Sequence, residues 1–213
     1  MSDQSCGTPG GEYPTDCELT EALRQRALSR QISIVRSDLW KAALPRARQV
    51  RLLLLDVDGV LTDGRITYIS GHVEAKSFHT QDGLGIKLLQ DSGVAVGIIT
   101  ARSSEAVERR ARDLQLAHVF QGQRDKLTVY ETILRETGLR PPQTAYMGDD
   151  LLDLPVLNRV GLAAAPADAV AEIQQRVHYV TTRGGGGGAV RELCDLIMES
   201  QGNLARMRAR FDR

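Results

Sequence analysis

Short apolar runs alternate with longer amphipathic segments from residue 51 onward, and this pattern predicts an α/β fold. The first run contains the consecutive leucines Leu52–Leu55, which is typical of a strand buried on both faces. The predicted strands are Leu52–Asp56, Val94–Thr100, His118–Gln121, Thr144–Gly148, Gly161–Ala164 and Val177–Thr181. The predicted helices are Leu84–Asp91, Ser104–Gln115, Lys126–Thr137, Asp150–Arg159 and Ala189–Glu199. Repeated strand–helix units of this length predict a Rossmann-like, doubly wound parallel sheet.

One segment breaks the alternation. Arg65–Phe78 reads RITYISGHVEAKSF, and its period-two pattern around Ser70-Gly71-His72 predicts a β-hairpin. The hairpin follows the first strand directly and is too short to form a separate cap domain. We therefore expect a small insertion whose exposed strand edges pair with another subunit.

The pattern divides the chain into three predicted parts. Residues 1–48 form an extension, of which the first 16 residues are rich in Gly, Pro, Ser and Thr and are expected to be disordered. Leu19–Leu44 has helical spacing, and Pro45 is expected to end that helix. Residues 49–201 form the α/β domain, and residues 202–213 form a basic C-terminal tail.

Composition narrows the function without changing the fold. Lys plus Arg and Asp plus Glu both total 27, so no overall field attracts nucleic acid or an anionic membrane, and neither partner is expected. Cys6, Cys17 and Cys194 share no metal-ligand spacing and are read as reduced thiols. The N-terminus lacks the features of a signal peptide, and no apolar run approaches the ~20 residues that span a bilayer. We expect a cytoplasmic protein.

Two carboxylates follow the leucine strand. Because side chains alternate along a strand, Asp56 and Asp58 leave its end in the same direction. Carboxylates this close require a cation or a shared proton to relieve their repulsion. The carboxyl ends of parallel strands are where open α/β sheets place their active sites, so the chain is predicted to be an enzyme.

Three further clusters fall at the same predicted sheet edge. Thr100 ends one strand, Lys126 begins a helix, and Gly148–Asp153 reads GDDLLD. In isolation, each has an ordinary interpretation as a helix cap or a solvated side chain. Together, the acids, the hydroxyl and the ammonium are typical of a phosphoryl-transfer site that holds Mg²⁺.

These motifs resemble the haloacid dehalogenase superfamily of aspartate-nucleophile phosphatases over about residues 51–201. The matching elements are DVDGVLTDG, IIT, Lys126 and GDDLLD, in that order. The hairpin in place of a cap domain, FHTQDGLGI (Phe78–Ile86) and GGAVRELCDLI (Gly187–Ile197) resemble a capless, homotetrameric member that acts on an eight-carbon acid sugar phosphate. The resemblance implies a sugar phosphate substrate and a homotetramer, which we expect to form through the hairpin.

The resemblance also implies catalytic roles. Asp56 would attack phosphorus to form an aspartyl-phosphate, and Asp58 would protonate the leaving oxygen and then deprotonate water. Thr100 and Lys126 would bind the phosphoryl oxygens.

A metal site is implied by the same resemblance. Mg²⁺ would be held by the carboxylates of Asp56 and Asp149 and by the main-chain carbonyl of Asp58. Asp150 and Asp153 would orient the metal, water or lysine from behind.

Substrate contacts are expected from Thr62, Gly83, Arg102 and Arg183. Gly83 and Gly85 either let the backbone approach a ligand or make the turn before a helix.

The sequence departs from the family at positions expected to recognise the carboxylate of the sugar acid substrate. Gly187 and Gln81 stand where relatives commonly carry basic residues, and Arg183 is expected to substitute for them. The run Gly184–Gly188 predicts a flexible loop, although amides ahead of a helix can also bind an anion.

Two other functions stay open from sequence. One is a phosphatase for a nine-carbon keto-sugar 9-phosphate, and the other is a non-catalytic regulatory relative. A phosphomutase would need shielding from water, which the missing cap does not provide.

Overall fold

The computed structural model describes residues 16–29, 36–69 and 73–212, and the chain divides into two compact units, Met1–Arg36 and Ser37–Arg213. In the first unit the described residues form one helix, α1 (Asp16–Ser29). Among the described residues, no helix is long and apolar enough to cross a membrane. Residues 1–15, on which the prediction of disorder falls, lie outside the described part, as does Cys6.

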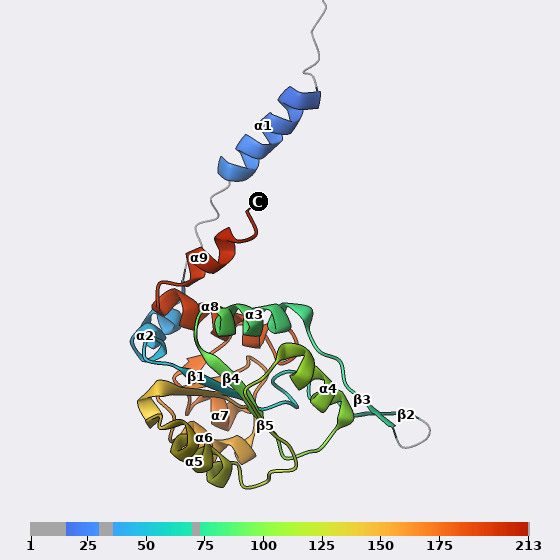
Figure 1. The fold of residues 1–213 in the computed structure, drawn as a ribbon, viewed down its shortest axis with the longest axis vertical. Helices are drawn as coiled ribbons and strands as arrows, with labels where there is room; N and C mark the ends of the chain where they lie inside the picture. Colours follow the sequence, from blue (N-terminus) through green and yellow to red (C-terminus); the bar gives the residue numbers. More distant parts are fainter. Residues whose placement is uncertain (1–15, 30–35, 70–72, 213) are drawn as a thin grey trace, which may run out of the picture. The chain divides into compact units, whose positions relative to one another are not determined.

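The second unit is built on a parallel sheet. Its described residues give six strands in the order β5-β4-β1-β6-β7-β8, and every neighbouring pair is parallel (Figure 1). The strands are β1 (Leu52–Leu55), β4 (Ala95–Ile99), β5 (His118–Phe120), β6 (Thr144–Met147), β7 (Leu162–Ala165) and β8 (Tyr179–Val180). The chain moves outward from β1 through β4 to β5 and then returns to β6 on the other side. This arrangement confirms the predicted doubly wound sheet, with its switch point beside β1.

Helices cover both faces of the sheet (Figure 1). The two faces of β1 belong to different buried clusters: Leu53 and Leu55 pack into one, and Leu52 and Leu54 pack into the other. Each cluster also contains side chains from one of two groups of helices. The first group is α2 (Asp38–Ala47), α3 (Thr80–Asp91), α4 (Glu105–Leu114), α8 (Ala189–Ser200) and α9 (Leu204–Ala209). The second group is α5 (Lys126–Thr137), α6 (Leu154–Leu157) and α7 (Ala171–Gln174). Short 3₁₀ turns, η1 (Pro141–Gln143) and η2 (Leu151–Asp153), precede β6 and α6.

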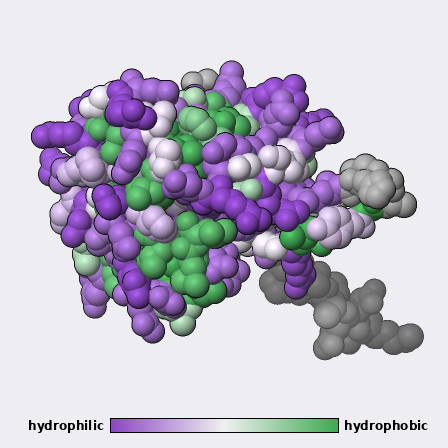
Figure 2. Space-filling view, turned by 90° about the horizontal axis from the view of Figure 1, so that it is seen from below, coloured by the Kyte–Doolittle hydropathy of each residue, from purple (hydrophilic) through white to green (hydrophobic). Residues whose placement is uncertain are grey.

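The predicted hairpin is present between β1 and α3. It consists of the antiparallel strands β2 (Thr67–Ile69) and β3 (Val73–Ala75), and the predicted turn Ser70–His72 lies outside the described residues. Tyr68 is 73% exposed and Ile69 is 51% exposed. Figure 2 shows hydrophobic surface on this projection. No cap domain occurs among the described residues of this insertion.

The helix predicted to stop at Pro45 continues through it to Ala47. Proline removes one backbone donor, but the turn persists because the Arg48 N–H donates to the Leu44 carbonyl at 3.0 Å and Ala47 is fully buried. Trp40 is buried as well, so α2 packs onto the sheet and the compact unit begins at Ser37, ahead of the predicted start at residue 49.

The helix predicted to start at Leu84 begins four residues earlier, at Thr80. His79 caps it by accepting a hydrogen bond from the Gln81 N–H at 3.2 Å. Gly83 and Gly85 therefore lie inside α3, and neither makes a turn. Both are buried where α3 approaches its neighbours, since a Cβ at Gly83 would meet Arg110 of α4 and one at Gly85 would meet Arg191 of α8.

Two expectations for the C-terminal third are wrong. The glycine run is not a loose loop: a Cβ on Gly185 would lie 1.9 Å from the Gly59 carbonyl oxygen, and the Gly186 N–H donates to the Val60 carbonyl. The last segment is not simply a charged tail, because it forms α9 and buries Leu204 and Met207 against the core.

We expect Gly85→Ala to lower the free energy of unfolding by about 1–3 kcal/mol, because its methyl group would lie 3.1 Å from the Arg191 Cα. Relief of this contact would require the backbone of α8 to move away from α3. Gly83→Ala is the matched control in the same helix. Its methyl group would clash with the far end of the Arg110 side chain, which can move, and would lie at an ordinary contact distance of 3.4 Å from Leu114 Cδ2. Helix propensity should offset this clash, so stability should change by less than about 1 kcal/mol. Urea unfolding measures both, and equal losses would contradict this account.

Candidate active site

The carboxyl edge of the sheet gathers the predicted chemical groups. Asp56 follows β1 and Thr100 follows β4, while Lys126 is the first residue of α5. Because β4, β1 and β6 are adjacent, their ends meet around one cavity of about 260 Å³. Its lining includes Asp56, Asp58, Thr100, Arg102, Lys126, Asp149, Asp150 and Asp153.

Asp153 is a fully buried acceptor at the base of this cavity. One carboxylate oxygen accepts from the Lys126 ammonium at 2.5 Å and from the Tyr146 hydroxyl at 2.6 Å. The other accepts from the N–H groups of Asp149 and Asp150 at 3.0 and 3.3 Å. Asp153 therefore fixes both the lysine and the loop that carries Asp149.

Lys126 bridges two carboxylates. Its ammonium lies 3.0 Å from an Asp56 oxygen and is almost completely buried. Burial alone would lower the pKa of Lys126, but the adjacent Asp153 and Asp56 raise it above its usual value. The side chain is thus a fixed positive charge beside Asp56.

The remaining carboxylates carry excess negative charge. Burial, followed by the charge of Asp153, raises the pKa of Asp56 to about 7 despite the opposing effect of Lys126. Burial and the charges of Asp153 and Asp56 raise the pKa of Asp149 to about 7. One ammonium does not compensate three carboxylates, so the site favours an additional cation.

The donor set suits a hard divalent cation. Oxygens of Asp56, Asp149 and Asp153 lie within 4.8 Å of one another, and oxygen-only ligation is what Mg²⁺ prefers. Both Asp153 oxygens are already committed to donors, which leaves Asp56 and Asp149 as the side-chain ligands. The Asp149 carboxylate lies against Gly59, where a Cβ would come within 2.1 Å of it, so this carboxylate reaches the backbone beside Asp58 only because residue 59 is glycine.

Asp58 contacts Arg102, which the sequence pattern singled out, and Lys76, which it did not. Its carboxylate pairs with Lys76 and lies 3.7 Å from the Arg102 guanidinium. Lys76 also pairs with Glu74 at 2.8 Å, and Glu74 accepts from Arg102 at 2.6 Å. Lys76 follows β3, so the return of the hairpin brings its side chain to Asp58. Its position immediately after the second strand of the hairpin is the sequence feature that could have identified it.

The structure separates the other predicted contacts. Among the described residues, Arg102 lines the cavity, but Thr62, Gly83 and Arg183 do not. The Thr62 hydroxyl accepts from the Gly64 N–H and donates to the Val57 carbonyl, which shapes the loop after β1. Arg183 donates to Gln81 at 3.1 Å and to the Gly187 carbonyl at 3.3 Å. Gly83 is buried beside Arg110.

Asp150 acts as a local cap. It is exposed, and its carboxylate accepts from the Leu151 N–H at 2.7 Å at the start of η2. Tyr146 was not predicted, because its buried position in β6 reads as core; only its hydroxyl contacts with Asp153 and Lys126 place it behind the site.

Comparison with known proteins shows which family the chain belongs to. The haloacid dehalogenase-like hydrolase profile matches residues 117–193. The 3-deoxy-D-manno-octulosonate 8-phosphate phosphatase KdsC of Yersinia pestis is 47% identical over 161 residues, covering 76% of this chain and 86% of that protein. The Escherichia coli K12 enzyme of the same name is 45% identical over the same shares.

A solved structure of similar fold comes from Moraxella catarrhalis. It is a 3-deoxy-D-manno-octulosonate 8-phosphate phosphatase in complex with a magnesium ion, a phosphate ion and KDO, with a TM-score of 0.78, 41% identity, and coverage of 79% of this chain and 97% of that one. The chain belongs to the haloacid dehalogenase-like hydrolases, in the family that contains these 3-deoxy-D-manno-octulosonate 8-phosphate phosphatases. The predicted resemblance is confirmed.

We expect Asp153→Asn to lower the free energy of unfolding by about 1–3 kcal/mol, because the amide NH₂ would face the Asp149 and Asp150 N–H donors or the Lys126 ammonium. Relief of repulsion with Asp56 recovers only part of this loss. Asp150→Asn is the control: asparagine caps as well as aspartate, so stability should stay within about 0.5 kcal/mol. Chemical denaturation without metal measures both, and an unchanged Asp153→Asn protein would refute the role of this carboxylate.

Proposed function

We propose that this protein is a Mg²⁺-dependent phosphomonoesterase that hydrolyses 3-deoxy-D-manno-octulosonate 8-phosphate (KDO 8-phosphate) to KDO and phosphate, a step of lipopolysaccharide sugar synthesis. The observation that carries the proposal is the Asp56–Lys126–Asp153 arrangement beside Asp149, in the cavity that Asp58 also lines. Identity of 41–47% to phosphatases of that name supports the substrate.

Asp56 is the nucleophile in this mechanism. Its carboxylate attacks phosphorus, the phosphorus–oxygen bond to the sugar breaks, and an aspartyl-phosphate forms. Asp58, two residues on, gives a proton to the departing sugar oxygen. It then accepts a proton from the water that attacks the phosphorus. The bond between phosphorus and the Asp56 oxygen breaks, which releases phosphate and restores the Asp56 carboxylate.

Lys126 and Thr100 bind the phosphoryl oxygens. Lys126 stays charged because Asp153 and Asp56 flank it, so it offers positive charge where the transferring group passes. Thr100 is buried at the end of β4 and lines the cavity, and its hydroxyl would donate to the same phosphoryl group.

Asp56, Asp149 and the Asp58 main-chain carbonyl would hold the Mg²⁺. When bound, it offsets the carboxylate charge and lowers the repulsion between Asp56 and a phosphate dianion. The raised pKa values of Asp56 and Asp149 reflect the same uncompensated charge.

The alternative substrate is a nine-carbon keto-sugar 9-phosphate. Phosphate release from KDO 8-phosphate, a nine-carbon analogue and a generic aryl phosphate, each with Mg²⁺ and with EDTA, separates the candidates. We expect the highest kcat/KM for KDO 8-phosphate with Mg²⁺ and no turnover in EDTA. A higher value for the nine-carbon ester would reassign the substrate, and no release from any ester would favour a non-catalytic relative.

Asp56→Asn should reduce phosphate release by at least about a thousandfold, because it removes the nucleophile. The melting temperature in EDTA should not fall, since the substitution also removes one of the repelling carboxylates. Asp150→Asn is the control and should keep most of the activity. Substantial turnover by Asp56→Asn would exclude the aspartyl-phosphate mechanism.

We also propose a cytoplasmic homotetramer that forms through the hairpin. Its exposed Tyr68 and Ile69 and the unpaired edges of β2 and β3 support a subunit contact there. Light scattering of a Tyr68→Arg variant should show smaller particles than the wild type, whereas Val119→Arg, at an exposed apolar residue of β5, should not change the mass. A fully active wild-type monomer would refute the assembly.

A further inference from the structure

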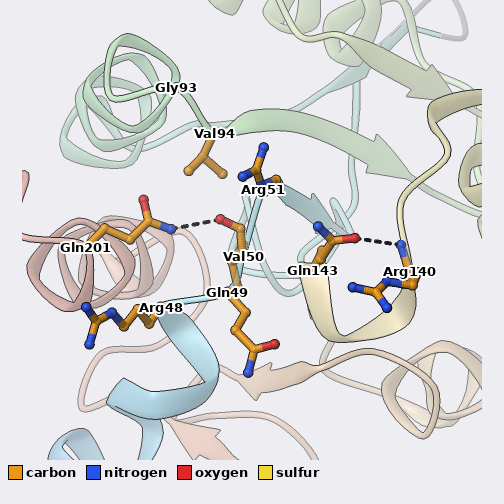
Figure 3. A pocket seen from close by; sticks show the side chains of 9 residues that line it. All are labelled: Arg48, Gln49, Val50, Arg51, Gly93, Val94, Arg140, Gln143 and Gln201. Atoms are coloured by element: carbon orange, nitrogen blue, oxygen red, sulfur yellow. Dashed lines mark hydrogen bonds between the residues drawn. The ribbon is translucent and has the colours of Figure 1, made fainter.

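A second cavity lies at the amino edge of the sheet, away from the carboxylates. Its volume is about 380 Å³, and Figure 3 shows its lining. Three arginines, Arg48, Arg51 and Arg140, and three glutamines, Gln49, Gln143 and Gln201, supply its polar groups. Among the described residues, no carboxylate lines it. In a chain with equal numbers of acidic and basic residues, this is a local concentration of positive charge.

The three arginines have no acidic partner among the residues that the structure describes. In the part of the chain that the structure describes, no carboxylate lies within ion-pair distance of Arg48, Arg51 or Arg140. Other surface arginines differ: Arg208 and Arg210 each lie within 3 Å of an aspartate oxygen. The charges of the pocket are therefore available to a ligand.

Hydrogen bonds fix the segments that carry two of these arginines. The Gln143 side-chain oxygen accepts from the Arg140 N–H at 3.0 Å, and the Gln143 carbonyl accepts from the Arg51 N–H at 2.7 Å. Gln201 donates to the Val50 carbonyl at 2.8 Å from the opposite side (Figure 3). Three chain segments distant in sequence are thus held around the cavity before any ligand arrives, which lowers the entropic cost of binding.

We propose that this arginine pocket, defined by Arg48, Arg51 and Arg140, binds a small polyphosphate anion, either inorganic or the triphosphate group of a nucleotide. Guanidinium groups bind phosphate oxygens in bidentate fashion, and three of them match a ligand with several phosphates better than a monoanion. The volume falls within the range of small-ligand sites.

The arginine pocket is separate from the active site. Arg51 immediately precedes β1 and Asp56 immediately follows it, so the two residues lie at opposite ends of this strand, roughly 17 Å apart at about 3.3 Å per residue. Binding can therefore be measured without the catalytic groups.

Isothermal titration of the full-length protein with sodium tripolyphosphate and with ATP, both in EDTA, tests the proposal. We expect saturable binding of at least one ligand. Binding should weaken at least about tenfold in Arg51→Gln/Arg140→Gln, because each loses charge-assisted hydrogen bonds. The control Arg109→Gln/Arg112→Gln removes two exposed charges from α4 and should bind within about threefold of the wild type.

Phosphate release by the arginine-pocket variant should equal that of the wild type, which shows that it is folded; if it is not, Arg51→Gln and Arg140→Gln are titrated singly. Binding of tripolyphosphate alone identifies an inorganic ligand, and tighter binding of ATP identifies a nucleotide. The proposal is overturned if neither ligand binds the wild type, or if the arginine-pocket variants bind as tightly as the control.

Discussion

The site depends on one buried ion pair, between Lys126 and Asp153. Asp153 has no exposed surface and uses both oxygens, so it holds the lysine on one side and the backbone of the Asp149 loop on the other. The ammonium in turn lies beside Asp56. Removing a buried charge from its partner is far more costly than breaking a surface pair, so this contact sets the separation between the nucleophile strand and the Asp149 loop.

Close backbone packing supports the same loops. Gly59 admits the Asp149 carboxylate, and Gly185 and Gly186 press against the segment that follows β1. A side chain at any of these positions would push that segment away from the acids. The glycine run 184–188, which the sequence predicts to be flexible, is therefore closely packed against the segment that carries Asp58. Asp82 holds the end of this glycine run in place by accepting hydrogen bonds from the Gly188 and Arg191 N–H groups at the start of α8.

The two edges of the sheet carry opposite chemistry. The carboxyl edge concentrates acids that require a cation, and the hairpin adds Lys76 and Glu74 beside Asp58. The amino edge presents arginines without acidic partners among the described residues. Because the whole chain is neutral, neither edge could be inferred from net charge. The proposed polyphosphate pocket and the phosphatase site would bind related anions by different means, guanidinium groups in one case and a lysine, a hydroxyl and a metal in the other.

The sequence by itself determined the sheet, the hairpin and the groups gathered at the carboxyl edge. Leucine runs and strand–helix spacing are local signals, and parallel topology brings the strand ends together whatever the detailed packing. Only the tertiary structure decided which groups touch. Gly83 lies outside the candidate site because it packs against α4, and Arg183 lies outside it because its side chain donates to Gln81. The sequence did not predict Lys76 and Tyr146 as site residues. Their partners, Asp58 and Asp153, lie 18 and 7 residues away in the chain, and contacts between separate elements leave no periodic pattern in the sequence.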